Sequence, residues 1–154
     1  LVHDTVAHYT TETLIAIAWG VRAAGYPFEA PQDFLWTNLG TLLALVIVLN
    51  KALNDMVRVA RANAGLPKLA DTQAAYAPTH GVIARLRKAA RFVPFHRLYH
   101  SVELTIMIFV FSIVGLFIGA TLADRILLSV LVPLSVLAAI GHFVAIMTSK
   151  RVRG

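Results

Sequence analysis

Two long apolar segments separated by only two residues constrain the fold of this chain more than any other feature. Leu104–Ala123 has twenty residues without a charge, and Ile126–Thr148 has twenty-three residues whose only ionisable side chain is His142. At about 1.5 Å per residue, each can cross about 30 Å of hydrocarbon as a helix. Because only Asp124 and Arg125 lie between them, the pattern predicts an antiparallel hairpin of two transmembrane helices.

The composition agrees with a membrane protein. Hydrophobic residues make up 58% of the 154 residues and charged residues 14%, whereas about a quarter of the residues are charged in soluble domains. The chain has no cysteine, which excludes disulfides, thiolate metal sites and cysteine nucleophiles. The net charge of +6 comes from basic residues beside apolar segments. This arrangement favours anionic lipid, and not nucleic acid, as a partner.

A third apolar segment begins a long helix predicted over 34–64. Its part at 34–50 is apolar enough to cross, and Gly65 followed by Pro67 supplies a helix stop. The N-terminal segment 1–33 lies in the interface or crosses weakly, because Arg22 interrupts its apolar run. The predicted fold is therefore all-α, a single polytopic membrane bundle of three or four transmembrane helices, with the hairpin at 101–148.

Basic residues gather on one side of the predicted spans. Residues 51–100 hold nine Lys or Arg against two Asp, and the tail 149–154 adds three more basic residues. The positive-inside rule places both on the inner side, the matrix or cytoplasm. Within 65–100, a basic amphipathic helix is expected at the membrane surface. The candidate ligands for lipid headgroups such as cardiolipin are Arg85, Arg87, Lys88, Arg91, Arg97 and Tyr99.

The stretch PFHRLYHSVEL contains the candidate cofactor ligands. His96, His100 and Glu103 share one helix face at spacings of four and three. If the hairpin turns near Ala123, Glu103 and His142 lie at nearly equal depth. Three interpretations follow: the polar side chains satisfy one another between helices, they hold haem, quinone or a metal ion, or they form an interface collar.

Small residues on the predicted transmembrane helices indicate close helix packing. The candidates are Ser112, Gly115 and Gly119, with Gly40, Ala44 and Ala138 as further members. Pro133 lies inside the last apolar segment, where it frees the carbonyl of Ser129 and is expected to kink the helix.

The size of the chain and its basic loop resemble the MAPEG family of small membrane enzymes. That family carries an Arg-x-x-x-Asn-x-x-Glu motif, and the matching register here is His96, His100 and Glu103, so only the glutamate agrees. The resemblance implies a stand-alone membrane enzyme that binds glutathione. With two of the three motif residues replaced, we keep this as an alternative and do not assign the family.

The favoured function is a non-catalytic accessory subunit of an energy-transducing membrane complex, such as a mitochondrial respiratory complex or ATP synthase. It would pack against other membrane subunits and bind anionic lipid, without a cofactor or a metal ion. The mitochondrial inner membrane is expected because the chain starts at Leu1, which suggests removal of a targeting segment, and because its basic loop is one-sided. The main alternative is a redox subunit in which His100 and His142 hold haem b or bind quinone.

Overall fold

The structure is a computed structural model that describes residues 2–25, 33–66 and 101–148. In these ranges the chain is all-helical, as the sequence predicted, and forms four helices and no strand. The helices are α1 (Val2–Ala24), α2 (Asp33–Asn63), α4 (Ser101–Ile118) and α5 (Ala120–Thr148). The basic amphipathic helix predicted within 65–100 lies outside the described residues.

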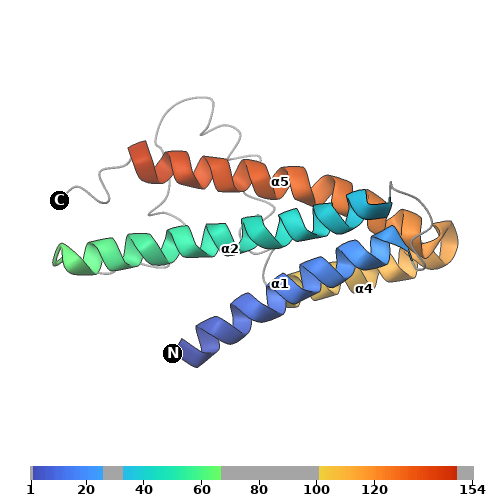
Figure 1. Ribbon diagram of the computed structural model, residues 1–154, viewed down its shortest axis with the longest axis horizontal. Coiled ribbons are helices and arrows are strands. Elements are labelled where there is room, and N and C mark those ends of the chain that lie inside the picture. Colours follow the sequence, from blue (N-terminus) through green and yellow to red (C-terminus); the bar gives the residue numbers. More distant parts are fainter. Residues whose placement is uncertain (1, 26–32, 67–100, 149–154) are drawn as a thin grey trace.

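The helices form two antiparallel pairs that pack on each other (Figure 1). In the first pair, α1 and α2 lie close together near the α4–α5 turn and diverge toward the N-terminus of α1. In the second pair, α5 returns along α4 and also packs against α2. The turn between α4 and α5 extends beyond the ends of α1 and α2 (Figure 1).

Helix α2 covers the range in which the sequence predicted one long helix. It ends where expected, because Gly65 adopts a left-handed φ of 66° that favours glycine. The Leu66 N–H then donates to the Arg61 carbonyl at 2.9 Å. This hydrogen bond satisfies a carbonyl that the helix end would otherwise leave without a donor.

The turn of the α4–α5 hairpin lies at Gly119, and not at Asp124 and Arg125 as the sequence suggested. Gly119 has a φ of 95°, and its N–H donates to the Gly115 carbonyl at 2.8 Å. The sequence argument assumed that charged residues belong in the loop. Both charged residues instead lie within α5 and contact α1.

Gly119→Ala is expected to destabilise the folded protein by about 1 kcal/mol, because an alanine at this φ brings its Cβ close to the following carbonyl. The added Cβ would meet nothing else within 4 Å, so the loss arises from the backbone alone. Gly119→Asn should lose less, since asparagine tolerates the left-handed region better. Unfolding in a detergent titration checks the order, and equal stability of the alanine variant and the wild type would contradict it.

In the part of the chain that the structure describes, two helices, α4 and residues 120–144 of α5, are long and apolar enough to cross a membrane. Only 11% of the apolar stretch of α4 and 33% of that of α5 are buried within the chain. The buried core instead gathers where all four helices meet, around the fully buried Leu43, Leu104 and Leu128. Most of the apolar surface of α4 and α5 therefore faces outward, as expected for helices surrounded by lipid.

Candidate functional site

Four polar side chains meet where the end of α1 contacts the α4–α5 hairpin. In this Asp124 cluster, Arg22 grips the Asp124 carboxylate with two nitrogens, Nε at 2.7 Å from Oδ2 and Nη2 on Oδ1. Trp19 Nε1 donates to Oδ1 at 3.1 Å, and Arg22 Nη2 also donates to Ser112 Oγ at 3.2 Å. Two-point contacts of this kind fix the relative orientation of the two side chains as well as pairing their opposite charges. The Asp124 side chain is 1% exposed and that of Arg22 is 45% exposed. Because Arg22 lies on α1 and Asp124 on α5, the pair connects α1 to the hairpin.

The next residue, Arg125, caps the end of α1. Its Nε donates to the Ala23 carbonyl at 2.9 Å and its Nη2 to the Ala24 carbonyl at 3.2 Å. The guanidinium also lies 5.2 Å from the centre of the Trp36 ring on α2. The last carbonyls of a helix lack donors and carry partial negative charge, so a cation is favourable there. Arg125 thus joins α1, α2 and α5 at one point.

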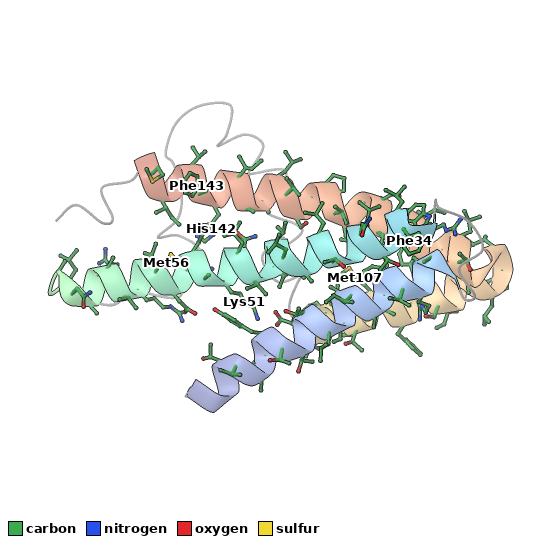
Figure 2. All side chains as sticks on the ribbon, in the orientation of Figure 1. Phe34, Lys51, Met56, Met107, His142 and Phe143 are labelled. Atoms are coloured by element: carbon green, nitrogen blue, oxygen red, sulfur yellow. The ribbon has the colours of Figure 1, made fainter. Side chains whose placement is uncertain are left out.

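A second group of polar side chains joins α1, α2 and the start of α4. In this Glu12 cluster, the fully buried Glu12 forms an ion pair with Lys51 through Oε2. Its Oε1 accepts a hydrogen bond from the Ser101 N–H at 3.2 Å. This donor is among the unpaired backbone groups at the N-terminus of α4, where a negative charge is favourable. Figure 2 shows Lys51 extending from α2 toward α1.

The Glu12 cluster continues outward through Tyr9 and Asp55. Tyr9 Oη donates to Asp55 Oδ2 at 2.5 Å, and Lys51 Nζ lies 4.9 Å from the centre of the Tyr9 ring. Burial and then the hydrogen bond to Asp55 raise the pKa of Tyr9 to about 12. Tyr9 lies outside α4 and residues 120–144 of α5, and beyond the Glu12–Lys51 pair toward the N-terminus of α1. It therefore remains a neutral donor at every physiological pH.

The raised pKa of Tyr9 makes stability fall at alkaline pH. The folded state holds the tyrosine proton more tightly than the unfolded state, whose tyrosine has a pKa near 10. The stabilisation is complete below pH 10 and is lost as pH rises toward about 12. Asp55→Asn should move the Tyr9 pKa back toward 10. Ultraviolet titration checks this against Tyr9→Phe, which identifies the Tyr9 signal, and an unchanged pKa in Asp55→Asn would contradict it.

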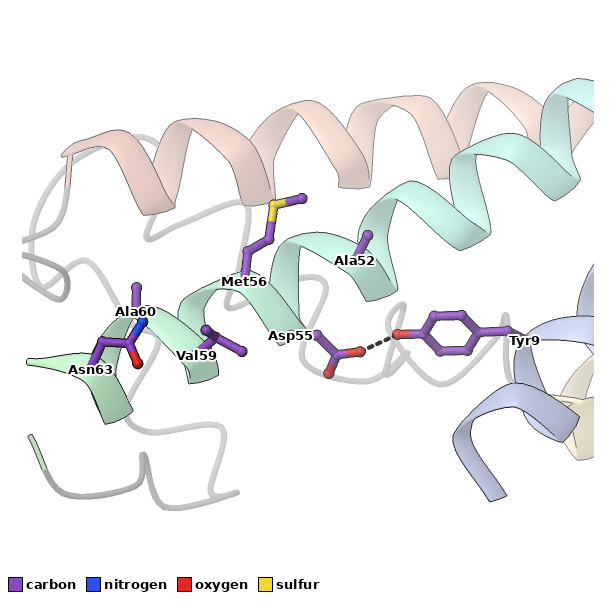
Figure 3. Close-up of a pocket in the computed structure, with 7 residues that line it drawn as sticks. All are labelled: Tyr9, Ala52, Asp55, Met56, Val59, Ala60 and Asn63. Atoms are coloured by element: carbon purple, nitrogen blue, oxygen red, sulfur yellow. Dashed lines mark hydrogen bonds between the residues drawn. The ribbon is translucent and has the colours of Figure 1, made fainter. Parts of the chain in front are cut away.

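A shallow groove of about 550 Å³ opens beside this tyrosine (Figure 3). Tyr9 and Asp55 form its polar end, and the other wall is one side of α2 with Ala52, Met56 and Val59. The polar atoms at that end already bond to each other. Within the described residues, no group of three or more His, Cys, Asp or Glu side chains is placed to hold a metal ion.

Two of the four predicted cofactor ligands lie in the described part of the chain. Nδ1 of His142 lies 3.2 Å from Oδ1 of Asn50 on α2, and Figure 2 shows where His142 lies on α5. Glu103 is half-buried in the first turn of α4. Glu103 lies 16 residues before Gly119 and His142 lies 23 residues after it. The observed turn therefore offsets them by about 10 Å along the hairpin, and the equal depth expected from a turn near Ala123 is not found.

The other predicted ligands fall outside the described residues. These are the candidate cofactor ligands His96 and His100 and the candidate lipid ligands Arg85, Arg87, Lys88, Arg91, Arg97 and Tyr99. They stay predictions.

The three predicted packing residues have three different environments. An added Cβ at Gly115 would lie 2.9 Å from the Ala120 Cα, so this glycine permits the close approach at the hairpin turn. Ser112 bonds to the Ile108 carbonyl and accepts from Arg22. Gly119 forms the turn itself and has no neighbour within 4 Å of an added Cβ. Its role is conformational and not helix packing.

The sequence reasoning did not single out Glu12, Lys51 and Asp55, and it interpreted Asp124 as a loop residue. The sequence did indicate that such pairs exist, because an isolated charge within an apolar run needs a partner. Finding which charge pairs with which requires the offset between helices far apart in the sequence.

We compared the chain with protein-family models, curated proteins and solved structures, and none matches it.

Proposed function

We propose that the chain is an integral membrane protein that acts as a non-catalytic packing subunit of a larger membrane assembly. One observation carries the proposal: the internal charges pair across helices while the long apolar faces point outward. Arg22 pairs with Asp124, and Lys51 pairs with Glu12. Outward on α4 lie large apolar side chains such as Phe109 and Phe117. These pairs hold a rigid bundle that presents its hairpin to lipid and to neighbouring subunits.

We further propose that α1 and α2 also cross, which gives four spans. Charges in α1 and α2 argue against crossing when each helix is considered alone, but Glu12 and Lys51 neutralise each other at one end of the shared segment. The antiparallel packing places Tyr9 of α1 beside Asp55 of α2. The N-terminal end of α1 and the C-terminal end of α2 would therefore lie on the same side of the membrane.

Cysteine labelling tests this topology cleanly, because the chain has no native cysteine. Single cysteines at Val6 and Asn63 should react with a membrane-impermeant maleimide from the same side. A third cysteine at Thr121, beside the hairpin turn, should react from the opposite side. Labelling of the Val6 and Asn63 variants from opposite sides would show that α1 does not cross the membrane.

The finer assignment is to an energy-transducing complex, with the mitochondrial inner membrane as its expected location. It is supported by the sequence, in which basic residues gather in 51–100 and in the tail 149–154. We propose that these residues face the matrix or cytoplasm and bind anionic lipid such as cardiolipin.

Native electrophoresis of gently solubilised membranes tests the packing function. The chain has a mass of 16.8 kDa, and we expect it to migrate in an assembly with other membrane proteins identified by mass spectrometry. Migration only as a monomer or as a self-oligomer, with no other protein present, would overturn the proposed function.

A further inference from the structure

The Arg22 guanidinium keeps N–H groups that the Asp124 cluster does not use. Nε and Nη2 bind the Asp124 carboxylate, and Nη2 also donates to Ser112 Oγ. In the described part of the chain, no atom accepts a hydrogen bond from Nη1. The Arg22 side chain is nearly half exposed, and its contact with Ser112 lies at the surface of the bundle. The N–H groups of Nη1 therefore face the surroundings of the protein.

These N–H groups lie well inside one end of the hairpin. Arg22 contacts Ser112, which lies seven residues before the turn at Gly119, or about 10 Å along α4. The turn extends beyond the ends of α1 and α2 (Figure 1), and its side chains are apolar, with Leu116 81% and Phe117 85% exposed. In the proposed membrane location, lipid surrounds this apolar turn. The Arg22 guanidinium then lies below the headgroup level of a flat bilayer.

A charged donor at this depth needs an acceptor that lipid tails do not supply. Hydrocarbon has no hydrogen-bond acceptor and excludes water, and an arginine held there draws headgroups inward or extends toward them. A guanidinium also presents N–H groups in a planar fork that matches the oxygens of a phosphate. The phosphate of a phospholipid therefore fits the unused edge of Arg22.

An apolar strip continues from Arg22 toward the middle of the bundle. On α1, Ala18 lies about one turn from Arg22 on the same side and is exposed. On α4, Phe109 lies about one turn from Ser112, farther from the hairpin turn, and is 65% exposed. The charged end followed by an apolar strip has the polarity of a phospholipid, whereas a soluble anion would use only the charged end.

We propose that a phospholipid binds in the seam between α1 and α4, with its phosphate on Nη1 of Arg22 and an acyl chain along Ala18 and Phe109. We call this the Arg22 lipid site. It belongs to the leaflet opposite to the one that the proposed topology assigns to the basic residues of 51–100. The inference rests on the membrane location in the proposed function and adds a lipid site that the basic residues do not form.

Photoreactive phosphatidylcholine tests the site in liposomes that contain the purified full chain. One probe carries a diazirine on its headgroup, and the other carries it at the end of an acyl chain. Ile126 is the matched control, because it lies seven residues after Gly119, at the depth of Ser112, and is exposed. We expect the headgroup probe to label Arg22 or Ser112 and not Ile126, and the acyl-chain probe to label Ile126.

Two labelling patterns would overturn the Arg22 lipid site. Equal headgroup labelling of Ser112 and Ile126 would mean that the general headgroup level lies at this depth. Acyl-chain labelling alone at Arg22, Ser112 and Ile126 would mean that no phosphate reaches the guanidinium. A different result, in which the acyl-chain probe labels neither Phe109 nor any other residue of α4 and α5, would overturn the membrane location and with it the proposed function.

Arg22→Lys tests the phosphate contact itself. Lysine keeps a positive charge for Asp124, but it lacks the planar fork that binds a carboxylate and a phosphate at once. Headgroup labelling of Ser112 should fall by about 10-fold, as expected for the loss of a charge-assisted hydrogen bond. The matched control is Arg58→Lys, which changes a largely exposed arginine on α2 and should leave Ser112 labelling unchanged. Equal headgroup labelling of Arg22→Lys and the wild type would overturn the proposal.

Discussion

Arg22→Ala is expected to destabilise the folded protein by about 3 to 5 kcal/mol, the usual loss when one partner of a buried ion pair is removed. The Asp124 carboxylate would keep the hydrogen bond from Trp19 but lose both contacts with the guanidinium. Because the Asp124 side chain is almost fully buried, its charge would be left without a partner of opposite charge in an apolar surrounding. The contact between the end of α1 and the hairpin should weaken, although the Arg125 hydrogen bonds to the Ala23 and Ala24 carbonyls remain.

Asp124→Ala should be less damaging than Arg22→Ala, although it breaks the same pair. The Arg22 side chain is nearly half exposed, so its long stem can carry the freed charge toward the surface. Unfolding in a denaturing-detergent titration, followed by tryptophan fluorescence, checks the order. Arg58→Ala is the control, because the Arg58–Asp55 pair is largely exposed and such pairs contribute below about 1 kcal/mol. A larger loss for Asp124→Ala would contradict this account.

Periodicity and apolar length predicted the helices well, because both depend on residues close in the sequence. The long helix expected over 34–64 is α2, Asp33–Asn63, and Gly65 ends it by a local conformational preference. The hairpin follows similarly from two apolar runs that local sequence makes helical. Within 2–25, 33–66 and 101–148, only two of the expected three or four spans, α4 and most of α5, meet the length and composition of a membrane helix.

The candidate site was less accessible to sequence reasoning, because its contacts join distant helices. Asp124 was interpreted as a loop residue because charges usually flank membrane spans. It is nevertheless buried, because Arg22, which lies 102 positions earlier, neutralises its charge. The true turn at Gly119 then moves His142 away from the depth of Glu103 and beside Asn50. An error of a few residues in a turn thus changes which side chains face each other.

Gly40→Ala is expected to destabilise the α1–α2 pair by about 3 kcal/mol, because a side chain does not fit there. An added Cβ would lie 2.6 Å from the Gly20 Cα and 2.7 Å from the Ala16 carbonyl oxygen. Both atoms belong to the backbone of α1, so no side-chain rotation relieves the overlap. The two helices must move apart, although alanine itself favours helix formation by about 1 kcal/mol over glycine.

Gly141→Ala provides the matched control, because it adds the same methyl group to a helical glycine with nothing within 4 Å of the new Cβ. It should leave unfolding unchanged or raise stability by up to about 1 kcal/mol. A loss for Gly141→Ala equal to that for Gly40→Ala would show that the methyl group acts without the close approach of α1.

The double variant Gly20→Ala with Gly40→Ala tests whether the two glycines serve one contact. An added Cβ at Gly20 would lie 2.8 Å from the Gly40 Cα, so either substitution pushes the same two backbones apart. Once the first methyl group has separated the helices, the second meets less resistance, and the two losses should sum to more than the loss in the double variant. Strict additivity would mean that each glycine acts on a separate contact. A sub-additive loss would show that this single crossing point sets the distance between α1 and α2, and with it the reach of Lys51 to Glu12.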